Sequence, residues 1–442
     1  MAGARRARQE TRQEIDRFLS TEPVQVAELD LGDDEEAAAL RPGPGSPPVT
    51  SGAVFVLVRR RGRPVGTLLA RVPEGADPTR TLAALARRLH PAPAGGPGAA
   101  TPNGRLGSPV ASPGVSVVVA TRERARLLGR ALDSLLAQDH PDVEIVVVDN
   151  APVTDETREL VERKYAERVR YVCEPAPGLA VAHNRGLAAV RGEVVAFTDD
   201  DVVADPRWLT ELTAPFAADP GLGCATGLIL PARLRTPAQV LLESHGGFAK
   251  GFTPRTYDPA HPPAGEPLFP FTAGRFGSGA NMAFRTAVLR AAGGFDPATG
   301  AGTHARGGDD LYGFVRVLAQ GGRLHYTPTA LVWHHHRETW RDLETQAYGY
   351  GAGLTVYLTA ILVNRPALLP ALLARLPRGL AHARALTAVR DTDGGGAPGG
   401  HDERTHPWPR RLSRLQRRGM VYGPVGYLRA RYALRSAPRG TR

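Results

Sequence analysis

Residues 115–197 alternate between short apolar segments and amphipathic ones, and this alternation restricts the fold more than any other feature of the chain. The apolar runs 115–120, 143–148, 169–172 and 194–197 predict strands, and the segments 124–138, 154–166 and 179–190 between them predict helices. Short strands that alternate with helices form parallel sheets with helices on both faces. The sequence therefore predicts a doubly wound α/β domain.

The last of these strands, 194–197, leads directly into Thr198 and three consecutive aspartates, Asp199, Asp200 and Asp201. Open α/β sheets bind ligands at the carboxyl ends of their strands. Adjacent carboxylates repel one another, which raises some of their pKa values unless a cation compensates. In an extended turn Asp199 and Asp201 point to the same side, so these two are candidate ligands for Mg²⁺ or Mn²⁺ while Asp200 faces elsewhere. A solvated turn is the alternative interpretation.

Four segments carry a family resemblance: Val115 to Thr121, Val143 to Asn150, Gly178 to Gly186 and Thr198 to Asp201. In order and spacing they resemble family 2 glycosyltransferases with the GT-A fold, over about residues 113–340. The resemblance implies a Rossmann-like nucleotide-diphospho-sugar transferase domain. It also implies that residues 199–201 are the Asp-X-Asp motif, which binds a divalent metal and the nucleotide diphosphate.

The resemblance places a donor-nucleotide site at the ends of the first strands and at the start of the helix after 178. Asp149 matches the acidic residue that holds the base or ribose, although a helix cap is the alternative. His183 stands where the family usually has Arg, so either His183 or the adjacent Arg185 makes that contact. The expected nucleotide-binding residues are Thr121, Arg122, Arg124, Asp149, His183, Arg185, Asp199 and Asp200.

Two glycine-rich segments further along the chain complete the expected site. Residues 277–281 resemble the loop that lines the donor-sugar and acceptor side, with Gly279 and Asn281 as its candidate residues. Residues 307–310 resemble the family's Glu-Asp motif, with Asp309 in place of Glu. The match implies that Asp310 is the general base of an inverting transfer and that Asp309 supports the acceptor or orients Asp310. The alternative role for an aspartate here is to cap the following helix.

Three histidines follow the apolar strand 330–333. The family often has a histidine at this point that completes the metal site. His336, followed by Arg337, is most similar to the family's His-Arg pair, and His334 is the next candidate. Imidazole together with carboxylates favours Mn²⁺.

The composition along the chain predicts five regions. Residues 1–90 form a small α+β module, with strands 53–58 and 64–69 and a helix that begins after Asp77 and reaches about Leu89. A Pro/Gly linker (91–113) precedes the GT-A domain (114–340). A helical, candidate interfacial region (341–390) and a Gly hinge with a basic tail (391–442) follow. The apolar run 352–363 is too short to span a membrane.

Positive charge is concentrated at the carboxyl terminus. The formal net charge is +11, and residues 401–442 hold eleven Arg against Asp402 and Glu403. A basic tail with interspersed apolar residues favours an anionic membrane surface as partner and disfavours nucleic acid. Two cysteines without metal-like spacing and a polar amino terminus favour a cytoplasmic protein, peripheral on the inner face of the membrane.

The sequence thus predicts a metal-dependent, inverting glycosyltransferase that uses a UDP- or GDP-linked sugar and an acceptor hydroxyl, with a role in cell-surface polysaccharide or glycolipid synthesis. One alternative is a catalytically inactive protein that binds a sugar nucleotide or an anionic lipid. The other is a nucleotidyltransferase, which we expect to carry a Gly-rich phosphate-binding loop after its first strand; residues 121–124 lack one.

Overall fold

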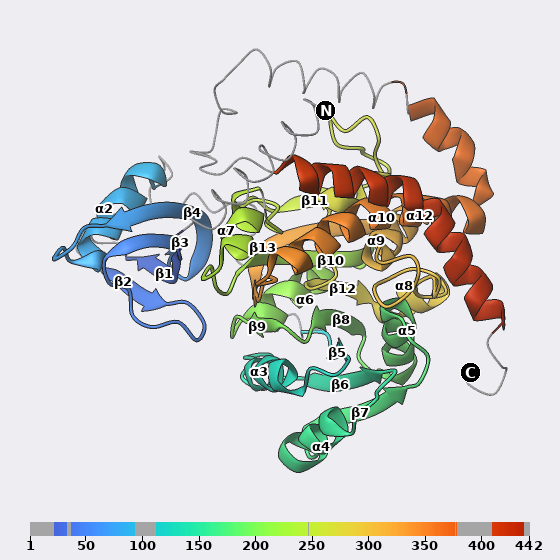
Figure 1. The fold of residues 1–442 in the computed structure, drawn as a ribbon, viewed down its shortest axis with the longest axis horizontal. Helices are drawn as coiled ribbons and strands as arrows, with labels where there is room; N and C mark the ends of the chain where they lie inside the picture. Colours follow the sequence, from blue (N-terminus) through green and yellow to red (C-terminus); the bar gives the residue numbers. More distant parts are fainter. Residues whose placement is uncertain are drawn as a thin grey trace, which may run out of the picture.

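The computed structural model describes residues 22–32, 37–92, 112–245, 247–375, 377 and 409–436. Two sheets organise them (Figure 1). The larger sheet has the order β11-β13-β10-β12-β8-β5-β6-β7, with β9 paired to β13, and the smaller one has the order β2-β1-β3-β4. The predicted Gly hinge (391–400) and residues 93–111 of the predicted linker lie outside the described residues.

One half of the large sheet is parallel, as the alternation predicts. Its strands are β5 (Val115–Thr121), β6 (Val143–Asn150), β7 (Val169–Glu174) and β8 (Val194–Asp199). The helices between them are α3 (Ala125–Leu135), α4 (Glu156–Leu160) with its continuation η1 (Val161–Tyr165), and α5 (Leu179–Ala189). The predicted α/β class is confirmed, and the helix expected over 154–166 is present as α4 followed by one turn of π-helix.

The other half of the sheet is mixed, because β12 (Met282–Arg285) lies antiparallel between β8 and β10 (Leu222–Pro231). β13 (Arg323–His334) runs parallel to β10, and the short strands β9 (Val202–Ala204) and β11 (Arg255–Tyr257) pair antiparallel with it. The helical elements of this half are α6 (Trp208–Ala218), α7 (Pro237–Ser244), η2 (Ala273–Arg275), α8 (Thr286–Ala291) and α9 (Asp309–Ala319).

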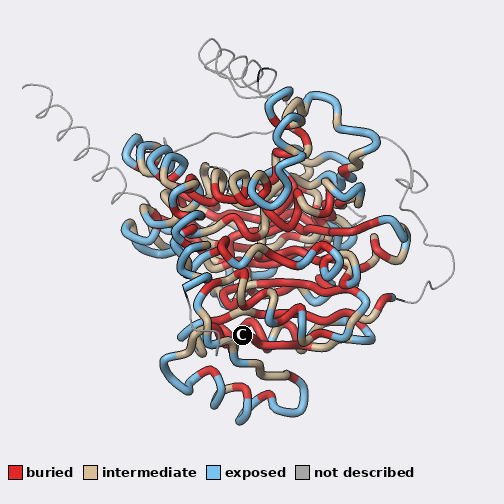
Figure 2. The backbone as a smooth tube through the Cα atoms, turned by 90° about the vertical axis from the view of Figure 1, so that its right-hand side faces the viewer, coloured by how far each residue is buried: buried red, intermediate tan, exposed pale blue. Residues whose placement is uncertain are grey.

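Helices cover both faces of the large sheet, so its strands are buried on both sides (Figure 2). On one face Leu128 and Leu132 of α3 pack with Trp208 of α6. On the other face Ala180 of α5 and Phe314 of α9 belong to a second apolar cluster. This three-layer packing leaves the strand ends as the places where polar side chains can gather.

The amino-terminal module consists of β1 (Gln25–Leu31), β2 (Ala38–Pro42), β3 (Gly52–Arg60), β4 (Arg63–Val72) and α2 (Pro78–Leu89). Asp77 caps α2 by accepting hydrogen bonds from Thr79 and Arg80, as the sequence indicates. Helix α2 covers one face of this sheet, while Phe55 and Leu57 on the other face pack with Trp333 of β13. The module is therefore fixed against the large sheet. Strands β1 and β2 were not predicted.

Two long helices close the carboxyl-terminal part. α10 (Trp340–Asn364) is followed by η3 (Pro366–Leu368), and α12 (Arg410–Ser436) lies along α10 (Figure 1). Close contact requires small residues: a Cβ on Gly419 would lie 2.1 Å from the Tyr348 carbonyl oxygen, and one on Gly423 would lie 2.0 Å from Thr355 Oγ1. Residues 410–436, which the sequence analysis assigns to a basic tail, thus form a helix packed on the domain.

Among the described residues, no single helix is both long and apolar enough to cross a bilayer. Helix α10 and the segment 366–375 together meet this test, by length and composition only. The chain bends by 112° between α10 and this segment.

Candidate active site

The carboxyl ends of three parallel strands bring polar residues to one edge of the sheet. The register aligns Thr121 of β5 with Asp149 of β6, and Ala120 of β5 with Asp199 of β8. Ligand sites of open α/β sheets form at such an edge. The predicted convergence of these residues follows from the parallel pairing alone.

Asp200 is held by the loop after β5. Its carboxylate accepts a hydrogen bond from Thr121 Oγ1 at 2.7 Å and one from Arg124 Nη1 at 2.7 Å. The same guanidinium group lies 3.1 Å from Asp201 Oδ2. Asp200 therefore points toward the loop after β5, whereas the sequence predicted only that it faces away from the side shared by Asp199 and Asp201.

Asp199, Asp201 and His334 form a candidate metal centre. One ligand atom from each lies within 4.8 Å of the others. Asp201 Oδ1 lies 3.2 Å from His334 Nε2, but it is buried without a hydrogen bond. Two carboxylates and an imidazole are a donor set that Mn²⁺ and Mg²⁺ accept, with imidazole favouring Mn²⁺. The residues present fit a divalent cation.

The electrostatics of this centre also fit a cation. Burial and the charge of Asp201 raise the pKa of Asp199 to about 7. Burial would also raise the pKa of Asp201, but His334 and Arg124 outweigh it and hold that pKa well below its usual range. The repulsion predicted for adjacent carboxylates is thus present at Asp199, and a divalent cation would relieve it.

His336 lies behind His334 and outside this group of ligand atoms, which corrects its prediction as a metal ligand. Its Nδ1 is 3.1 Å from His334 Nδ1, and its Nε2 is 3.1 Å from Glu243 Oε2 on α7. The Gln239 side chain donates to the His336 carbonyl oxygen at 3.1 Å. Helix α7 therefore sets the orientation of both histidines, a role that the sequence analysis did not assign to Glu243.

The second carboxylate pair begins α9. Asp310 Oδ2 accepts a hydrogen bond from the Gly279 amide at 2.9 Å, and its Oδ1 accepts one from Leu311 at 2.8 Å. Burial and the charge of Asp309 raise the pKa of Asp310 to about 6. Gly308 precedes the pair with a φ of 88°, and a Cβ there would lie 2.6 Å from the Gly353 carbonyl oxygen on α10. Glycine is required at this turn.

Two hydrogen bonds link Asp310 to the metal centre. Thr198, which precedes Asp199, donates from Oγ1 to the Ala280 carbonyl oxygen at 2.8 Å. Ala280 follows Gly279, the residue whose amide binds Asp310. The antiparallel pairing of β12 with β8 produces this contact, because it brings the segment before Met282 to the carboxyl end of β8. The candidate metal centre and the Asp310 carboxylate therefore belong to one site.

Asp309 and His183 are both buried and lie side by side, with 3.3 Å between His183 Nδ1 and Asp309 Oδ2. The His183 ring also contacts Phe197 and Phe295, at centroid distances of 4.9 and 5.2 Å. The structure therefore places His183 against the Asp309–Asp310 pair, in the apolar core, while Arg185 is exposed on α5.

Asn281 does not face the site, and its prediction as a sugar-loop residue is corrected. The side chain is fully buried, accepts from Trp208 Nε1 at 2.8 Å and donates to the carbonyl oxygens of Leu228 and Ala330 at 2.9 Å each. These bonds use its amide to join β10, β13 and α6. Gly279 of the same loop does reach the site, through its amide.

Asp149 lies at the end of β6, fully buried. Tyr171 donates to its Oδ2 at 2.9 Å, while its Oδ1 is buried without a hydrogen bond. Burial raises the pKa of this carboxyl group. The residue at the N-cap position of α4 is Asp155, so Asp149 is not a helix cap. Arg122 is exposed on the neighbouring loop after β5.

Lys250 and Tyr350 are further residues near the base that the sequence analysis did not single out. Burial lowers the pKa of Lys250, and the charge of the nearby Asp310 acts in the opposite direction. Phe248 contacts both His334 and Tyr350 through its ring, at 5.1 and 6.3 Å. Loop 247–254 and α10 therefore border the site, a proximity without a sequence motif.

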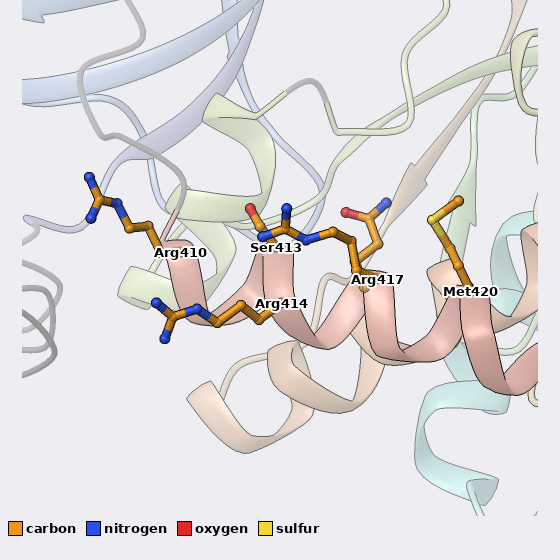
Figure 3. A pocket seen from close by; sticks show the side chains of 6 residues that line it. Arg410, Ser413, Arg414, Arg417 and Met420 are labelled. Carbon is orange, nitrogen blue, oxygen red and sulfur yellow. The ribbon is translucent and has the colours of Figure 1, made fainter. Parts of the chain in front are cut away.

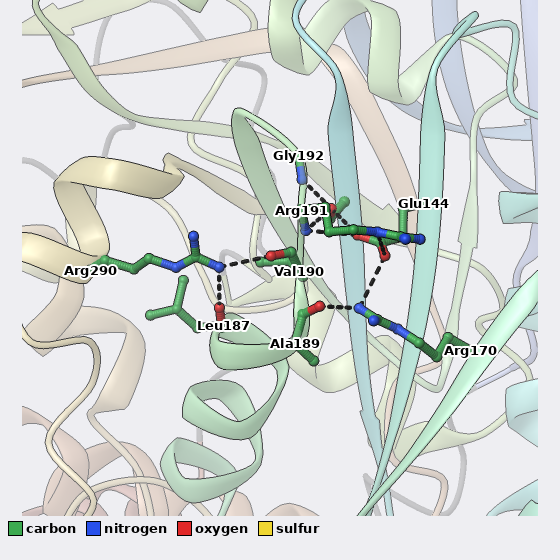
Figure 4. A network of polar contacts seen from close by, with 9 residues as sticks. Glu144, Arg170, Leu187, Ala189, Val190, Arg191, Gly192 and Arg290 are labelled. Atoms are coloured by element: carbon green, nitrogen blue, oxygen red, sulfur yellow. Dashed lines mark hydrogen bonds and ion pairs between the residues drawn. The ribbon is translucent and has the colours of Figure 1, made fainter.

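A different polar network lies at the opposite, amino-terminal ends of the parallel strands (Figure 4). Glu144 Oε1 lies 3.0 Å from both Arg170 Nη2 and Arg191 Nε, and these residues line a pocket of about 570 Å³. Arg170 also donates to the Ala189 carbonyl oxygen. Because its charges are paired within the network, we assign this edge a structural role that ties the end of α5 to β6.

A family described as "Glycosyltransferase like family 2" matches residues 113–348. An uncharacterized glycosyltransferase from Nostoc sp. is 36% identical over 112 residues, which cover 25% of this chain and 34% of the relative. The pre-mycofactocin glycosyltransferase of Mycobacterium tuberculosis is 28% identical over 243 residues, which cover 54% of this chain and 46% of the relative. The matches therefore span less than half of either relative's length.

Among solved structures, a mannosyltransferase from Pyrobaculum calidifontis in complex with GDP-Man and Mn²⁺ is similar. Its identity is 22%, its TM-score is 0.45, and the match covers 72% of this chain and 88% of that chain.

Proposed function

The chain belongs to glycosyltransferase-like family 2, and from this premise we propose that it transfers a sugar from a nucleoside diphosphate donor to an acceptor hydroxyl with inversion at the anomeric carbon. The observation that carries the proposal is the hydrogen-bonded link from Asp199 through Thr198 and Ala280 to the segment that binds Asp310. It brings a cation site for the leaving group and a base for the nucleophile into one site.

Asp199, Asp201 and His334 would hold the divalent cation. When bound, the cation supplies positive charge that offsets the charge developing on the departing diphosphate. Arg124 adds a fixed positive charge beside Asp200 and Asp201. Mn²⁺ or Mg²⁺ is the cofactor, and the imidazole ligand favours Mn²⁺.

Asp310 is the proposed general base. Its carboxylate accepts the proton of the acceptor hydroxyl as that oxygen forms a bond to the anomeric carbon, and the bond from this carbon to the diphosphate oxygen breaks with its electron pair. The amides of Gly279 and Leu311 fix the carboxylate's orientation. Asp309 and His183 behind it position α9 and act through Asp310.

The donor nucleoside is proposed to bind along the loops after β5 and β6. Thr121, Arg122 and Arg124 border this edge, and the unpaired Asp149 Oδ1 is an acceptor suited to a base N–H or a ribose hydroxyl. Arg185, exposed on α5, remains a candidate for a phosphate or nucleobase contact. UDP and GDP donors suit this arrangement equally.

We also propose that the protein acts in the cytoplasm, peripherally on the inner face of the membrane, in cell-surface polysaccharide or glycolipid synthesis. The charge distribution supports this, because eleven arginines are concentrated in the last 42 residues. A basic surface of this kind is attracted to anionic lipid headgroups.

A screen of nucleoside diphosphate sugars with and without Mn²⁺, followed by titration calorimetry and by assay of released diphosphate, tests the proposal. We expect Mn²⁺-dependent binding and turnover with one donor. Binding without turnover over a range of acceptor hydroxyls would favour the inactive binding protein. Consumption of a nucleoside triphosphate and a sugar phosphate would favour a nucleotidyltransferase.

The pH profile of transfer should reflect Asp310. The base must be ionised to accept a proton, and its raised pKa of about 6 means that the ionised fraction grows as the pH rises through 6. At saturating Mn²⁺ we expect the rate at pH 5 to be about one tenth of the plateau above pH 7. The charge of Asp309 contributes to the raised pKa of Asp310. In Asp309→Asn the rate of transfer should therefore begin to rise at a lower pH than in the wild type. A rate that stays flat down to pH 5 in the wild type would contradict the assignment.

Glu243 should tune the metal centre through His336. Since His334 Nε2 faces Asp201, its Nδ1–H is free to donate to His336 Nδ1, and His336 Nε2–H then donates to Glu243. Loss of such an outer carboxylate costs about 10- to 100-fold in metal affinity. We expect Glu243→Gln to weaken Mn²⁺ binding about tenfold and to recover activity at high Mn²⁺.

The matched control for this experiment is Glu193→Gln, which makes the same chemical change in a side chain that pairs with Arg285 before β8. It should leave the Mn²⁺ dependence unchanged. If Glu243→Gln lowered the maximal rate without altering the Mn²⁺ dependence, the role in orienting His334 would be wrong.

A further inference from the structure

The outer face of α12 carries one continuous stripe of exposed side chains. They recur at intervals of three or four positions, which places them on a single face of an α-helix. Arginines stand at both ends of the stripe, and four apolar side chains lie between them. The outer stripe consists of Arg410, Arg414, Arg417, Val421, Val425, Leu428, Tyr432 and Arg435.

The apolar part of the outer stripe is strongly exposed: Val421 is 81%, Val425 51%, Leu428 56% and Tyr432 74% accessible. Four neighbouring apolar side chains in water are unfavourable unless another surface covers them. The chain therefore exposes, on one helix, an apolar patch that calls for an apolar partner.

The cationic end of the outer stripe forms a pocket of about 500 Å³ (Figure 3). Arg410, Arg414 and Arg417 line it together with the polar side chains of Ser413 and Gln416 and the apolar side chain of Met420. Guanidinium and hydroxyl donors of this kind match phosphate oxygens, and arginine binds them with two parallel N–H groups. The partner should therefore be anionic as well as apolar.

The packing of α12 on α10 fixes which face is turned outward. Gly419, Gly423 and Gly426 lie on the opposite side of the helix, where a Cβ on any of them would come within 2.7 Å of a neighbouring atom. Thr355 Oγ1 also donates to the Met420 carbonyl oxygen at 2.8 Å. The helix cannot rotate about its axis without steric overlap, so the exposure of the outer stripe is built into the domain.

The inner side of the same helix contacts the loop that precedes the proposed base. Tyr427 donates to Asp296 Oδ2 at 2.8 Å, and a Cβ on Gly426 would lie 2.7 Å from the His304 carbonyl oxygen. Gly353 of α10 packs against Gly307 and Gly308, directly before Asp309. The outer stripe and the base therefore lie on opposite sides of one helical layer.

We propose that the outer stripe of α12 docks on the surface of an anionic phospholipid bilayer, with its arginines at the phosphates and its four apolar side chains among the upper acyl chains. An amphipathic helix that combines these two features binds in the plane of the interface. A nucleic acid would leave the apolar side chains uncovered. Resting on the proposed function, the docking identifies the surface through which the protein contacts the membrane.

The experiment measures partition of the full chain onto vesicles of phosphatidylcholine with and without phosphatidylglycerol. Deleting 391–442 is unsuitable, because it would also remove the packing on α10. The apolar variant is Val421→Asp with Val425→Asp, and its control is Leu69→Asp, since Leu69 is 54% exposed on β4 of the amino-terminal module. The charge variant is Arg414→Gln with Arg417→Gln, and its control is Arg158→Gln with Arg163→Gln on α4 and η1.

We expect the wild type to bind vesicles that contain phosphatidylglycerol, and binding to weaken at high salt because ions screen the arginines. Both α12 variants should lose at least tenfold in partition, and both controls should bind as the wild type does. Absence of wild-type binding, or equal loss in variants and controls, would overturn the proposal.

Mn²⁺-dependent nucleotide binding by the same preparations separates the two hypotheses. Normal nucleotide binding without vesicle binding contradicts the docking alone. Vesicle binding without nucleotide binding contradicts the proposed function alone.

Discussion

Replacing Asp310 with Asn should lower the rate of sugar transfer by about 10²- to 10⁴-fold, the contribution expected of a general base. The change keeps the shape of the side chain but removes the carboxylate that accepts the acceptor's proton. The Asp310 carboxylate accepts hydrogen bonds from the backbone amides of Gly279 and Leu311. In the variant, one of these two amides would face the new NH₂ group. Steady-state kinetics with saturating donor and Mn²⁺ measures the effect.

Donor binding provides the internal control for this variant. Asp310 is outside the metal centre, so Mn²⁺-dependent binding of the nucleoside diphosphate should change by no more than a few-fold. Asp133→Asn makes the same chemical change on α3, where the carboxylate pairs with Lys164, and should leave the rate unaltered. Equal activity in Asp310→Asn and the wild type would end the base assignment.

Replacing Asp201 with Asn should have the second largest effect, because it removes a charged ligand from the metal centre. Stabilisation of the leaving group by a cation contributes several kcal/mol, and each 1.36 kcal/mol corresponds to a tenfold change in rate. We expect a loss of at least about 100-fold in Mn²⁺ affinity and a comparable loss of transfer at limiting Mn²⁺. Chelation of the metal should abolish transfer, and added Mn²⁺ should restore it.

Asp200→Asn is the matched control, since it makes the same change at the adjacent residue. Asp200 pairs with Thr121 and Arg124 and is not among the ligand atoms, so its variant should bind Mn²⁺ within a few-fold of the wild type. Thermal melting gives a second measurement: Mn²⁺ should raise the midpoint of the wild type and of Asp200→Asn, but not that of Asp201→Asn. Equal losses in both variants would contradict the proposed division of roles.

Local sequence rules were sufficient wherever neighbouring strands decide the geometry. Thr121, Asp149 and Asp199 meet because each ends a strand of the same parallel sheet. The opposite orientations of Asp199 and Asp200 follow from the alternation of side chains along an extended segment. These features depend on strand periodicity, which is visible in the sequence.

The same rules could not separate the two histidines or place Asn281. His334 and His336 are two residues apart and therefore equivalent by strand alternation, but Glu243 of α7 binds His336, which leaves His334 beside Asp201. Asn281 sits in a glycine-rich segment typical of ligand loops, yet it bonds to Trp208 and to two strands. Each outcome depends on an element distant in sequence.

Local sequence rules also failed to predict the carboxyl-terminal helix α12. The sequence predicts a Gly hinge at 391–400 and a basic tail behind it, and Gly419, Gly423 and Gly426 within that tail have low intrinsic helix propensity. In the fold these glycines are the positions at which α12 approaches α10 most closely. Tertiary packing compensates for the low propensity and turns the arginines and apolar side chains of the outer stripe toward solvent.

The sequence by itself determined the α/β class, the edge of the sheet that carries the site and the carboxylates that end β8, because these follow from periodicity and from the repulsion of adjacent charges. Only the tertiary structure decided that His334 and not His336 lies with Asp199 and Asp201 in the candidate metal centre, that Asn281 is structural, and that the segment preceding Met282 joins Asp310 to Asp199. The physical reason is that these contacts join residues far apart in the chain, and such contacts form only once the helices and the mixed half of the sheet have packed.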